Sequence, residues 1–249
     1  MLTLSNVSKR YGSSPPVLEQ IDLVIDQGEF VSLIGPSGCG KSTLLKLISG
    51  LTSPSSGSIL VDGMTTVHAR KTVSYIFQDA TLLPWRTVSR NVGLGLELEH
   101  VSRETRKQKV ESLIELVGLS HVAKAYPRQL SGGMKMRVSV ARSLATTPRL
   151  LLMDEPFGAL DEMTRDRLNE ELLRLRAEQN WTAVFVTHSV AEAVFLSTRI
   201  IVLAPSPGRI AEEITIPLPF PRTSATRENP QFDSFVTEVS RALRGVHSA

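Results

Sequence analysis

A glycine-rich stretch with one lysine, GPSGCGKST, carries the clearest chemical signal in the sequence. It fits the spacing GxxxxGK[ST] and stands between the apolar run FVSLI and the apolar-faced segment STLLKLISGL. Glycines let backbone N–H groups curl around a phosphate, and the start of a helix adds a partial positive charge. The alternative is a glycine-rich turn that binds nothing. We expect the nucleotide phosphates to be held by Gly35, Pro36, Ser37, Gly38, Cys39, Gly40, Lys41, Ser42 and Thr43.

Carboxylates at the end of a second apolar run supply what a hydrolytic site needs. The run RLLLM is followed by Asp154 and Glu155, and parallel strands deliver such residues to one sheet edge. Asp154 can hold Mg²⁺, and Glu155 can polarise or deprotonate the attacking water as general base. A solvated turn is the alternative, disfavoured by the apolar residues before the pair and the proline after it.

Two more polar residues close apolar runs and are expected at the same edge. His188 ends TAVFVTH, and Gln78 follows VSYIF. The glutamine amide oxygen can reach Mg²⁺ or the water, and each residue can equally be a bystander. The candidate catalytic residues are therefore Lys41, Glu155 and His188, and the candidate metal ligands are Ser42, Gln78 and Asp154.

A second turn of the anion-binding kind begins LSGGMKMRVSVARSL, where Ser131, Gly132 and Gly133 lead directly into a helical pattern. A domain of this size would then hold two phosphate-binding turns.

The elements that position these residues follow from apolar spacing. Alternating stretches near the N-terminus predict a half-buried antiparallel sheet, whereas FVSLI, RLLLM and TAVFV predict strands buried on both faces. Strands alternating with helices predict a parallel sheet covered by helices on both faces, and hence an α/β fold. A hairpin is expected around SPGRI, and a last amphipathic helix through Phe232, Phe235, Val239 and Leu243 is expected to cap the core, with contact to a partner as the alternative.

Composition limits the class of protein. The chain is 41% hydrophobic and 21% charged with a net charge of +3, which is ordinary for a soluble globular domain. No run approaches the roughly 18 apolar residues of a membrane-spanning helix, so we expect a cytoplasmic protein. Its basic residues are scattered among acidic ones without interleaved aromatics, which argues against nucleic-acid binding. Cys39 is the single cysteine, and its place near a helix start suggests an acidic thiol whose alkylation blocks binding of the nucleotide.

Taken in order, these motifs resemble the nucleotide-binding subunit of an ATP-binding cassette (ABC) transporter, over about residues 1–215. The resemblance implies a P-loop NTPase fold with a RecA-like parallel core, an N-terminal antiparallel β subdomain and an inserted helical subdomain. We expect a single domain over residues 1–249. Its β subdomain and core take residues 1–89 and 148–215, the helical subdomain takes residues 90–147, and the tail takes residues 216–249.

The resemblance also implies ATP and Mg²⁺ as ligands and a homodimer that forms on ATP binding. In that dimer Ser131, Gly132 and Gly133 act on the ATP held by the other copy, Asp161 of GALD lies at the seam, and Tyr11 stacks on adenine. An aromatic residue that merely ends a strand is the alternative for Tyr11. A twofold pair accounts for the two turns, because each would face the partner's nucleotide.

Family members of this kind work with other polypeptides. The apolar segment Gln78–Asn91, with Trp85, is expected to contact transmembrane permease subunits and to hold the chain at the inner face of the membrane. Packing beneath the helical subdomain is the alternative. An external solute-binding protein would take part indirectly. The residues in and around the motifs most resemble those of importers of nitrate, sulfonate or taurine. Another importer class, a non-transport ABC ATPase, and a GTPase or kinase lacking LSGG are the alternatives.

Overall fold

Two β-sheets organise the chain, which a computed structural model describes over residues 1–205 and 207–247. Ser206, in the expected SPGRI hairpin, and the last two residues of the expected tail lie outside the described residues. In the described part, one sheet has the antiparallel order β2-β1-β4-β5 and the other the order β10-β9-β3-β8-β7-β6. Strands β9, β3, β8, β7 and β6 run parallel, and β10 pairs antiparallel with β9 at one edge.

The strands of the first sheet are β1 Leu2–Lys9, β2 Leu18–Ile25, β4 Ser56–Val61 and β5 Met64–Thr65. Those of the second sheet are β3 Phe30–Ile34, β6 Val73–Ile76, β7 Leu150–Asp154, β8 Thr182–Val186, β9 Arg199–Ala204 and β10 Arg209–Thr215. The helices are α1 Lys41–Ile48, α2 Val88–Val92, α3 Leu94–Leu98, α4 Arg103–Leu116, α5 Gly132–Leu144, α6 Glu162–Gln179, α7 Val190–Leu196, α8 Ser224–Arg227 and α9 Pro230–His247. Short 3₁₀ helices occupy His68–Thr72, Ser120–Val122 and Pro127–Gln129.

The central strands are buried on both faces, as their continuous apolar runs predict. In β3, Val31 and Leu33 pack into a core with α1 and the antiparallel sheet, whereas Phe30 and Ile34 pack into a second core with α5, α6 and α7. The same alternation continues through β7 and β8. Each fully buried side chain of this kind contributes roughly 1.5–3 kcal/mol of transfer free energy. The sheet that carries the site is therefore fixed from both sides.

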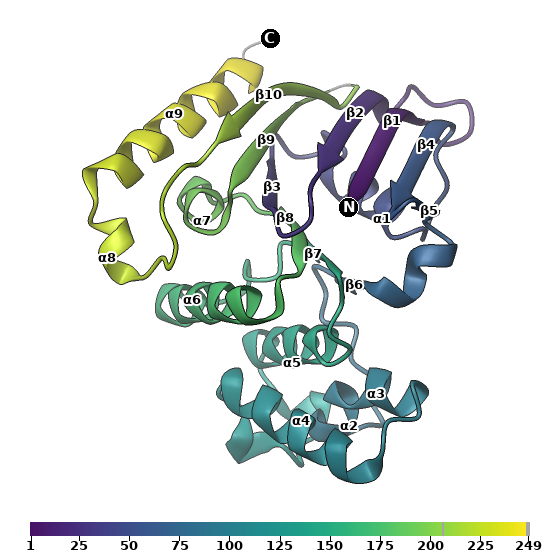
Figure 1. Cartoon of the computed structure of the whole chain (residues 1–249), viewed down its shortest axis with the longest axis vertical. Coiled ribbons are helices and arrows are strands. Elements are labelled where there is room, and N and C mark those ends of the chain that lie inside the picture. Colours follow the sequence, from purple (N-terminus) through teal and green to yellow (C-terminus); the bar gives the residue numbers. More distant parts are fainter. Residues whose placement is uncertain (206, 248–249) are drawn as a thin grey trace.

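Helices α2, α3, α4 and α5 lie between β6 and β7 in the chain (Figure 1). Helix α4 buries one apolar face, formed by Val110, Leu113 and Ile114. Figure 1 shows α2, α3 and α4 at the opposite end of the molecule from α9, with α5 between them and the core sheet.

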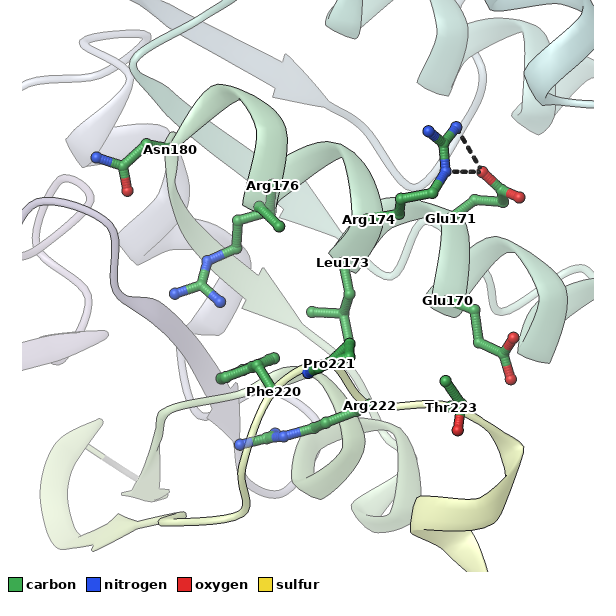
Figure 2. A pocket seen from close by; sticks show the side chains of 11 residues that line it. Glu170, Glu171, Leu173, Arg174, Arg176, Asn180, Phe220, Pro221, Arg222 and Thr223 are labelled. Atoms are coloured by element: carbon green, nitrogen blue, oxygen red, sulfur yellow. Dashed lines mark hydrogen bonds and ion pairs between the residues drawn. The ribbon is translucent and has the colours of Figure 1, made fainter.

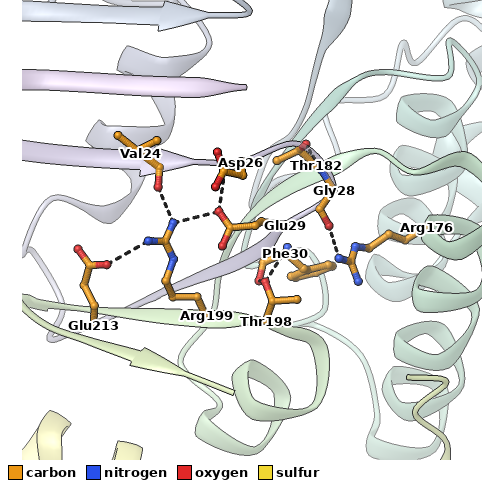
Figure 3. Close-up of polar contacts among 10 residues, drawn as sticks. All are labelled: Val24, Asp26, Gly28, Glu29, Phe30, Arg176, Thr182, Thr198, Arg199 and Glu213. Atoms are coloured by element: carbon orange, nitrogen blue, oxygen red, sulfur yellow. Dashed lines mark hydrogen bonds and ion pairs between the residues drawn. The ribbon is translucent and has the colours of Figure 1, made fainter. Parts of the chain in front are cut away.

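Arg199 at the start of β9 joins the two sheets (Figure 3). Its guanidinium donates to the carbonyl of Val24 on β2, to Glu29 at 3.1 Å and to Glu213 on β10 at 3.2 Å. Figure 3 also shows Arg176 of α6 reaching the carbonyl of Gly28 in the turn before β3. These contacts fix the turn that leads into the central strand.

The C-terminal segment is fastened to α7. Arg222 is 2% exposed and donates to the carbonyls of Val194, Phe195 and Ser197 at the end of that helix. Phe232 and Val239 of α9 are buried in the core, which confirms the expected cap. Among the residues that the structure describes, no helix has the length and apolar character needed to cross a membrane.

Candidate nucleotide-hydrolysing site

The loop between β3 and α1 has the backbone that the glycine-rich sequence predicts. Gly38 and Gly40 have φ values of +81° and +98°, a region that favours glycine. A Cβ at Gly40 would lie 2.5 Å from Cδ2 of Leu18, whereas one at Gly38 would meet nothing within 4 Å. The loop therefore packs tightly against β2 on one side and is open on the other, where phosphates would lie.

Lys41 opens α1 and turns back into this loop. Its Nζ donates to the carbonyls of Gly35 and Pro36, both at 2.8 Å, and the residue is only 6% exposed. A desolvated ammonium group surrounded by loop backbone is a strong attractor for phosphate oxygens.

Cys39 differs from the expectation of an acidic thiol. The residue is fully buried, and burial raises the pKa of its thiol despite the nearby charge of Lys41. Its N–H donates to the carbonyl of Pro36 at 3.3 Å. Desolvation therefore outweighs the helix start and the lysine, and rapid alkylation at this position is no longer expected.

Ser42 and Asp154 meet across the sheet edge. The hydroxyl of Ser42 donates to Oδ1 of Asp154 at 2.9 Å, and the hydroxyl of Tyr75 on β6 donates to Oδ2 at 3.2 Å. Asp154 is 5% exposed. A hydroxyl and a carboxylate beside a phosphate-binding loop are the protein ligands that Mg²⁺ takes when phosphate oxygens and waters supply the rest, so these residues fit the ion.

Glu155 and His188 lie just beyond the ends of the neighbouring strands β7 and β8 and contact each other. Nε2 of His188 lies 2.6 Å from Oε1 of Glu155, and Nε2 of Gln78 lies 3.4 Å from Oε2. Glu155 has a φ of +50°, uncommon for a residue with a side chain, and its N–H donates to the carbonyl of Val186 at 3.0 Å. The structure thus brings the predicted candidates Gln78, Glu155 and His188 together.

The LSGG segment forms the N-terminus of α5, with Ser131 as its cap through a 3.3 Å hydrogen bond from the N–H of Met134. A Cβ at Gly132 would meet nothing within 4 Å, whereas one at Gly133 would lie 3.0 Å from Cδ2 of Leu160. Within the described residues, no hydrogen bond joins Ser131–Gly133 to the loop 35–43. Ser131 and Gly132 are both exposed.

Asp161 and Tyr11 are both exposed. Asp161 caps α6 by accepting the N–H of Thr164 at 2.9 Å, and this hydrogen bond is the main cause that lowers the pKa of its carboxyl. Tyr11 is 47% exposed, with the ammonium of Lys9 lying 4.8 Å from its ring centroid. Each residue is accessible to a ligand or a partner.

Trp85 stands at the tip of an ordered loop, 69% exposed. The side chain of the fully buried Asn91 holds that loop by accepting the N–H of Leu83 at 2.8 Å and donating to the carbonyls of Leu83, Arg86 and Thr87. A cavity of about 740 Å³ beside Trp85 is lined by the arginines 86, 90, 103 and 106 together with other residues of α2, α3 and α4. Leu82 packs against the core, so only part of the apolar segment is free.

A second cavity, of about 650 Å³, lies between α6 and residues 220–223 (Figure 2). Figure 2 shows the Phe220 ring beside the guanidiniums of Arg176 and Arg222, which lie 5.1 and 4.1 Å from its centroid. None of the residues around the phosphate-binding loop lines this cavity, so it is separate from the site built above.

Three supporting residues were not predicted from the sequence. Tyr75 orients Asp154, Asn91 builds the Trp85 loop, and Arg142 of α5 donates to the carbonyls of Ala80 at 3.1 Å and Thr81 at 3.0 Å. The alternation in VSYIF was the available signal for Tyr75, since it sends every second residue of β6 to one face. The other two depend on loop conformation, which spacing does not reveal.

A phosphate-binding loop between a central parallel strand and a helix, with carboxylates at the end of another strand of the same sheet, defines the class of P-loop nucleotide hydrolases. Comparison with known proteins gives the family. The ABC transporter family matches residues 18–158, and the chain belongs to the ATP-binding cassettes of that family.

Relatives and solved structures agree with this assignment. The nitrate import ATP-binding protein NrtD of Synechocystis is 44% identical over 96% of this chain and 91% of its own length. The aliphatic sulfonates import ATP-binding protein SsuB of Bacillus cereus is 43% identical over 89% and 88%. A bacterial ABC transporter cassette solved as a dimer superposes with a TM-score of 0.81 at 34% identity, over 87% of this chain and 99% of that one. The chain is thus an ATP-binding ATPase of the ABC type.

Proposed function

We propose that the chain is the ATP-hydrolysing subunit of a membrane importer for a small solute. One observation carries the hydrolytic part: adjacent carboxylates at the end of β7 have separate partners. Asp154 contacts Ser42 of the phosphate-binding loop, whereas Glu155 contacts His188. One carboxylate is thereby suited to a metal and the other to a water molecule.

In this proposal each group acts at a stated place. The loop N–H groups and the ammonium of Lys41 bind the phosphates, and Ser42, Gln78 and Asp154 would hold Mg²⁺, which supplies charge neutralisation at the outer phosphates. Glu155 accepts a proton from the attacking water at its carboxylate. His188, 2.6 Å from that carboxylate, orients it by donating from Nε2. The products are ADP and inorganic phosphate.

A second copy completes the site. Ser131 and Gly132 are exposed, and in the described part of the chain neither is hydrogen-bonded to the chain's own phosphate-binding loop. A twofold pair would place each LSGG segment on the partner's nucleotide, so ATP would close a homodimer and its hydrolysis would loosen it. The cassette structure solved as a dimer supports this arrangement. Asp161 at the start of α6 and Tyr11 would then face the seam and the adenine.

The segment Gln78–Asn91 is proposed to bind a transmembrane permease, with Trp85 as anchor and the basic cavity beside it. This contact would place the chain at the inner face of the membrane. The relatives named for import of nitrate, aliphatic sulfonates and bicarbonate support a small-solute importer. Nitrate, a sulfonate or taurine is the proposed solute, selected by the permease and an external binding protein.

The test has two stages. The full chain is assayed for ATP hydrolysis beside Lys41→Ala, and loss in that variant is expected because the ammonium is the main charge in the loop. The chain is then reconstituted in vesicles with its permease and binding protein, and uptake of nitrate, an aliphatic sulfonate and taurine is measured. ATP-dependent uptake supports the proposal, whereas hydrolysis without any permease association would indicate a non-transport ATPase.

A further inference from the structure

A buried acid lies directly behind the catalytic candidate His188. Glu192 of α7 is 5% exposed, and its Oε2 accepts a hydrogen bond from the hydroxyl of Thr187, which is 4% exposed. Thr187 is the residue between the end of β8 and His188. The acid therefore holds the backbone immediately before the imidazole.

Hydroxyls of Thr187 and Ser189 fix the backbone after His188. The Thr187 hydroxyl oxygen accepts the N–H of Ser189 at 3.0 Å, and the hydroxyl of Ser189 accepts the N–H of Glu192 at 3.3 Å. In an ordinary capping box the glutamate side chain would accept a hydrogen bond from the backbone N–H of the capping serine. Here the Thr187 hydroxyl stands between them, so the cap of α7 is extended to the residue that precedes His188.

The surroundings of Glu192 act on the ionisation of its carboxyl. Burial raises the pKa of its carboxyl, and this outweighs the hydrogen bond from Thr187 and the opposing effects of Arg165 and Asn169 on α6 and Arg227 on α8. Arg227 is itself paired with Asp166 at 2.8 Å. A cavity of about 370 Å³ is lined by Glu155, His188 and Glu192 together, so the buried acid and the catalytic pair border the same space.

We propose that Glu192 is a positioning residue for ATP hydrolysis: through Thr187 it holds His188 against Glu155, and it does so by accepting a hydrogen bond, which an uncharged acceptor can also do. This inference rests on the proposed function, because it assigns a support to the same Glu155–His188 pair. The displacement of a catalytic contact by an ångström can cost on the order of 100-fold in rate, so a support of this kind is kinetically visible.

Three single variants of the full chain test the hydrogen bond. Glu192→Ala removes the acceptor and Thr187→Val removes the donor at nearly constant shape, so each is expected to lower kcat by about tenfold or more with KM for ATP changed less than about threefold. Glu192→Gln retains an acceptor for Thr187 without the acid and is expected to keep kcat within about twofold. Equal loss in Glu192→Gln and Glu192→Ala would overturn the claim that charge is dispensable.

A double variant distinguishes action through His188 from a role limited to capping α7. If Glu192 acts through His188, Glu192→Ala is expected to cause no further loss of kcat once His188→Ala is present. A general weakening of the fold would instead lower kcat by the same factor in both backgrounds, and that result would overturn the inference.

Folding and the proposed function are checked separately. Thermal unfolding shows whether Glu192→Ala folds; if it does not, Thr187→Val carries the test alone, and wild-type kcat in that variant refutes the inference. Absence of ATP hydrolysis by the unaltered chain would refute the proposed function. Hydrolysis by the unaltered chain with unchanged kcat in Glu192→Ala and Thr187→Val would refute the inference only.

Discussion

Nε2 of His188 lies 2.6 Å from Oε1 of Glu155, and the two side chains come from the ends of adjacent parallel strands. The pairing of Asp154 with Val186 brings the two residues close, because Glu155 directly follows the first position of that pair and His188 lies two residues beyond the second. The His188 side chain is 54% exposed and that of Glu155 is 17% exposed. The Glu155 carboxylate is thus largely shielded from solvent, whereas the imidazole that contacts it is about half exposed.

Glu155→Gln is expected to lower kcat for ATP hydrolysis by about 10²–10⁴ while ATP still binds, because an amide cannot accept the proton of the attacking water. ATP should then hold the variant as a dimer. Phosphate release measures the rate, and size-exclusion chromatography with ATP measures the dimer.

Glu178→Gln is the matched control, because Glu178 is exposed on α6 and pairs with Arg174 at 2.7 Å, away from the site. It should behave as the unaltered chain. Turnover by Glu155→Gln at the rate of this control would remove Glu155 from the role of base.

The parts of the site that depend on strand order were predictable from the sequence. Continuous apolar runs identify β3, β7 and β8, and parallel strands place the residues after them at one edge, which brings Glu155 and His188 together. The φ of +50° at Glu155 was not predictable, because local spacing does not report a turn imposed by tertiary contacts. The acidity expected for Cys39 was wrong for a similar reason: its burial depends on packing against segments distant in the sequence.

The raised pKa of Glu192 predicts a pH-dependent stability difference. Below its ordinary pKa of 4.5 the carboxyl is protonated in both the folded and the unfolded chain, so it has no effect. As pH rises above 4.5, only the unfolded chain ionises, and the free energy of unfolding falls until the folded pKa is passed. Each unit of pKa difference corresponds to about 1.4 kcal/mol.

Glu192→Gln stays neutral and is therefore expected to gain thermal stability over the unaltered chain as pH rises from 4.5 toward neutrality. Thermal unfolding across this range measures the difference, with Glu178→Gln as control for the replacement itself. A difference in Tm that is constant with pH would contradict the prediction.

Cys39 is expected to react slowly with a thiol reagent in the folded chain, because it is fully buried and burial raises its pKa from 9.0. Reaction should become complete on unfolding in denaturant. Mass spectrometry of the labelled chain over time measures both rates. Labelling of the native chain as fast as of the unfolded one would show that the loop opens readily.

Trp85→Ala is expected to weaken association with the permease by about 2 kcal/mol or more, since exposed aromatics are frequent anchors of interfaces. The Asn91 side chain is hydrogen-bonded to backbone groups of Leu83, Arg86 and Thr87, so the conformation of the loop should persist without the Trp85 side chain. Co-purification with the permease is the measurement. Val24→Ala, which alters a 53% exposed residue on β2, is the control. Equal recovery of the permease with both variants would exclude Trp85 as an anchor.

Action of the LSGG segment on the partner's ATP predicts complementation between two inactive variants. Ser131→Arg disrupts the ATP site on the partner copy, whereas Lys41→Ala disrupts the ATP site on the copy that carries it. A mixed dimer then holds one site with an intact phosphate-binding loop from the Ser131→Arg copy and an intact LSGG segment from the Lys41→Ala copy. Each variant alone should be inactive, and mixing them before ATP is added should restore hydrolysis.

A second mixture of two variants controls for the effect of mixing itself. In a mixture of the Ser131→Arg variant with a Gly132→Arg variant, every LSGG segment is altered, so no activity should return. The fold of one chain should tolerate the second substitution, because a Cβ at Gly132 would meet nothing within 4 Å. Ser131 also caps α5, and its replacement costs about 1 kcal/mol for that reason alone. Ser102→Arg removes the corresponding cap of α4 and reports that cost without touching the LSGG segment. If the segment acted on its own chain's ATP, both copies of the first mixture would lack a working site, and hydrolysis would stay absent.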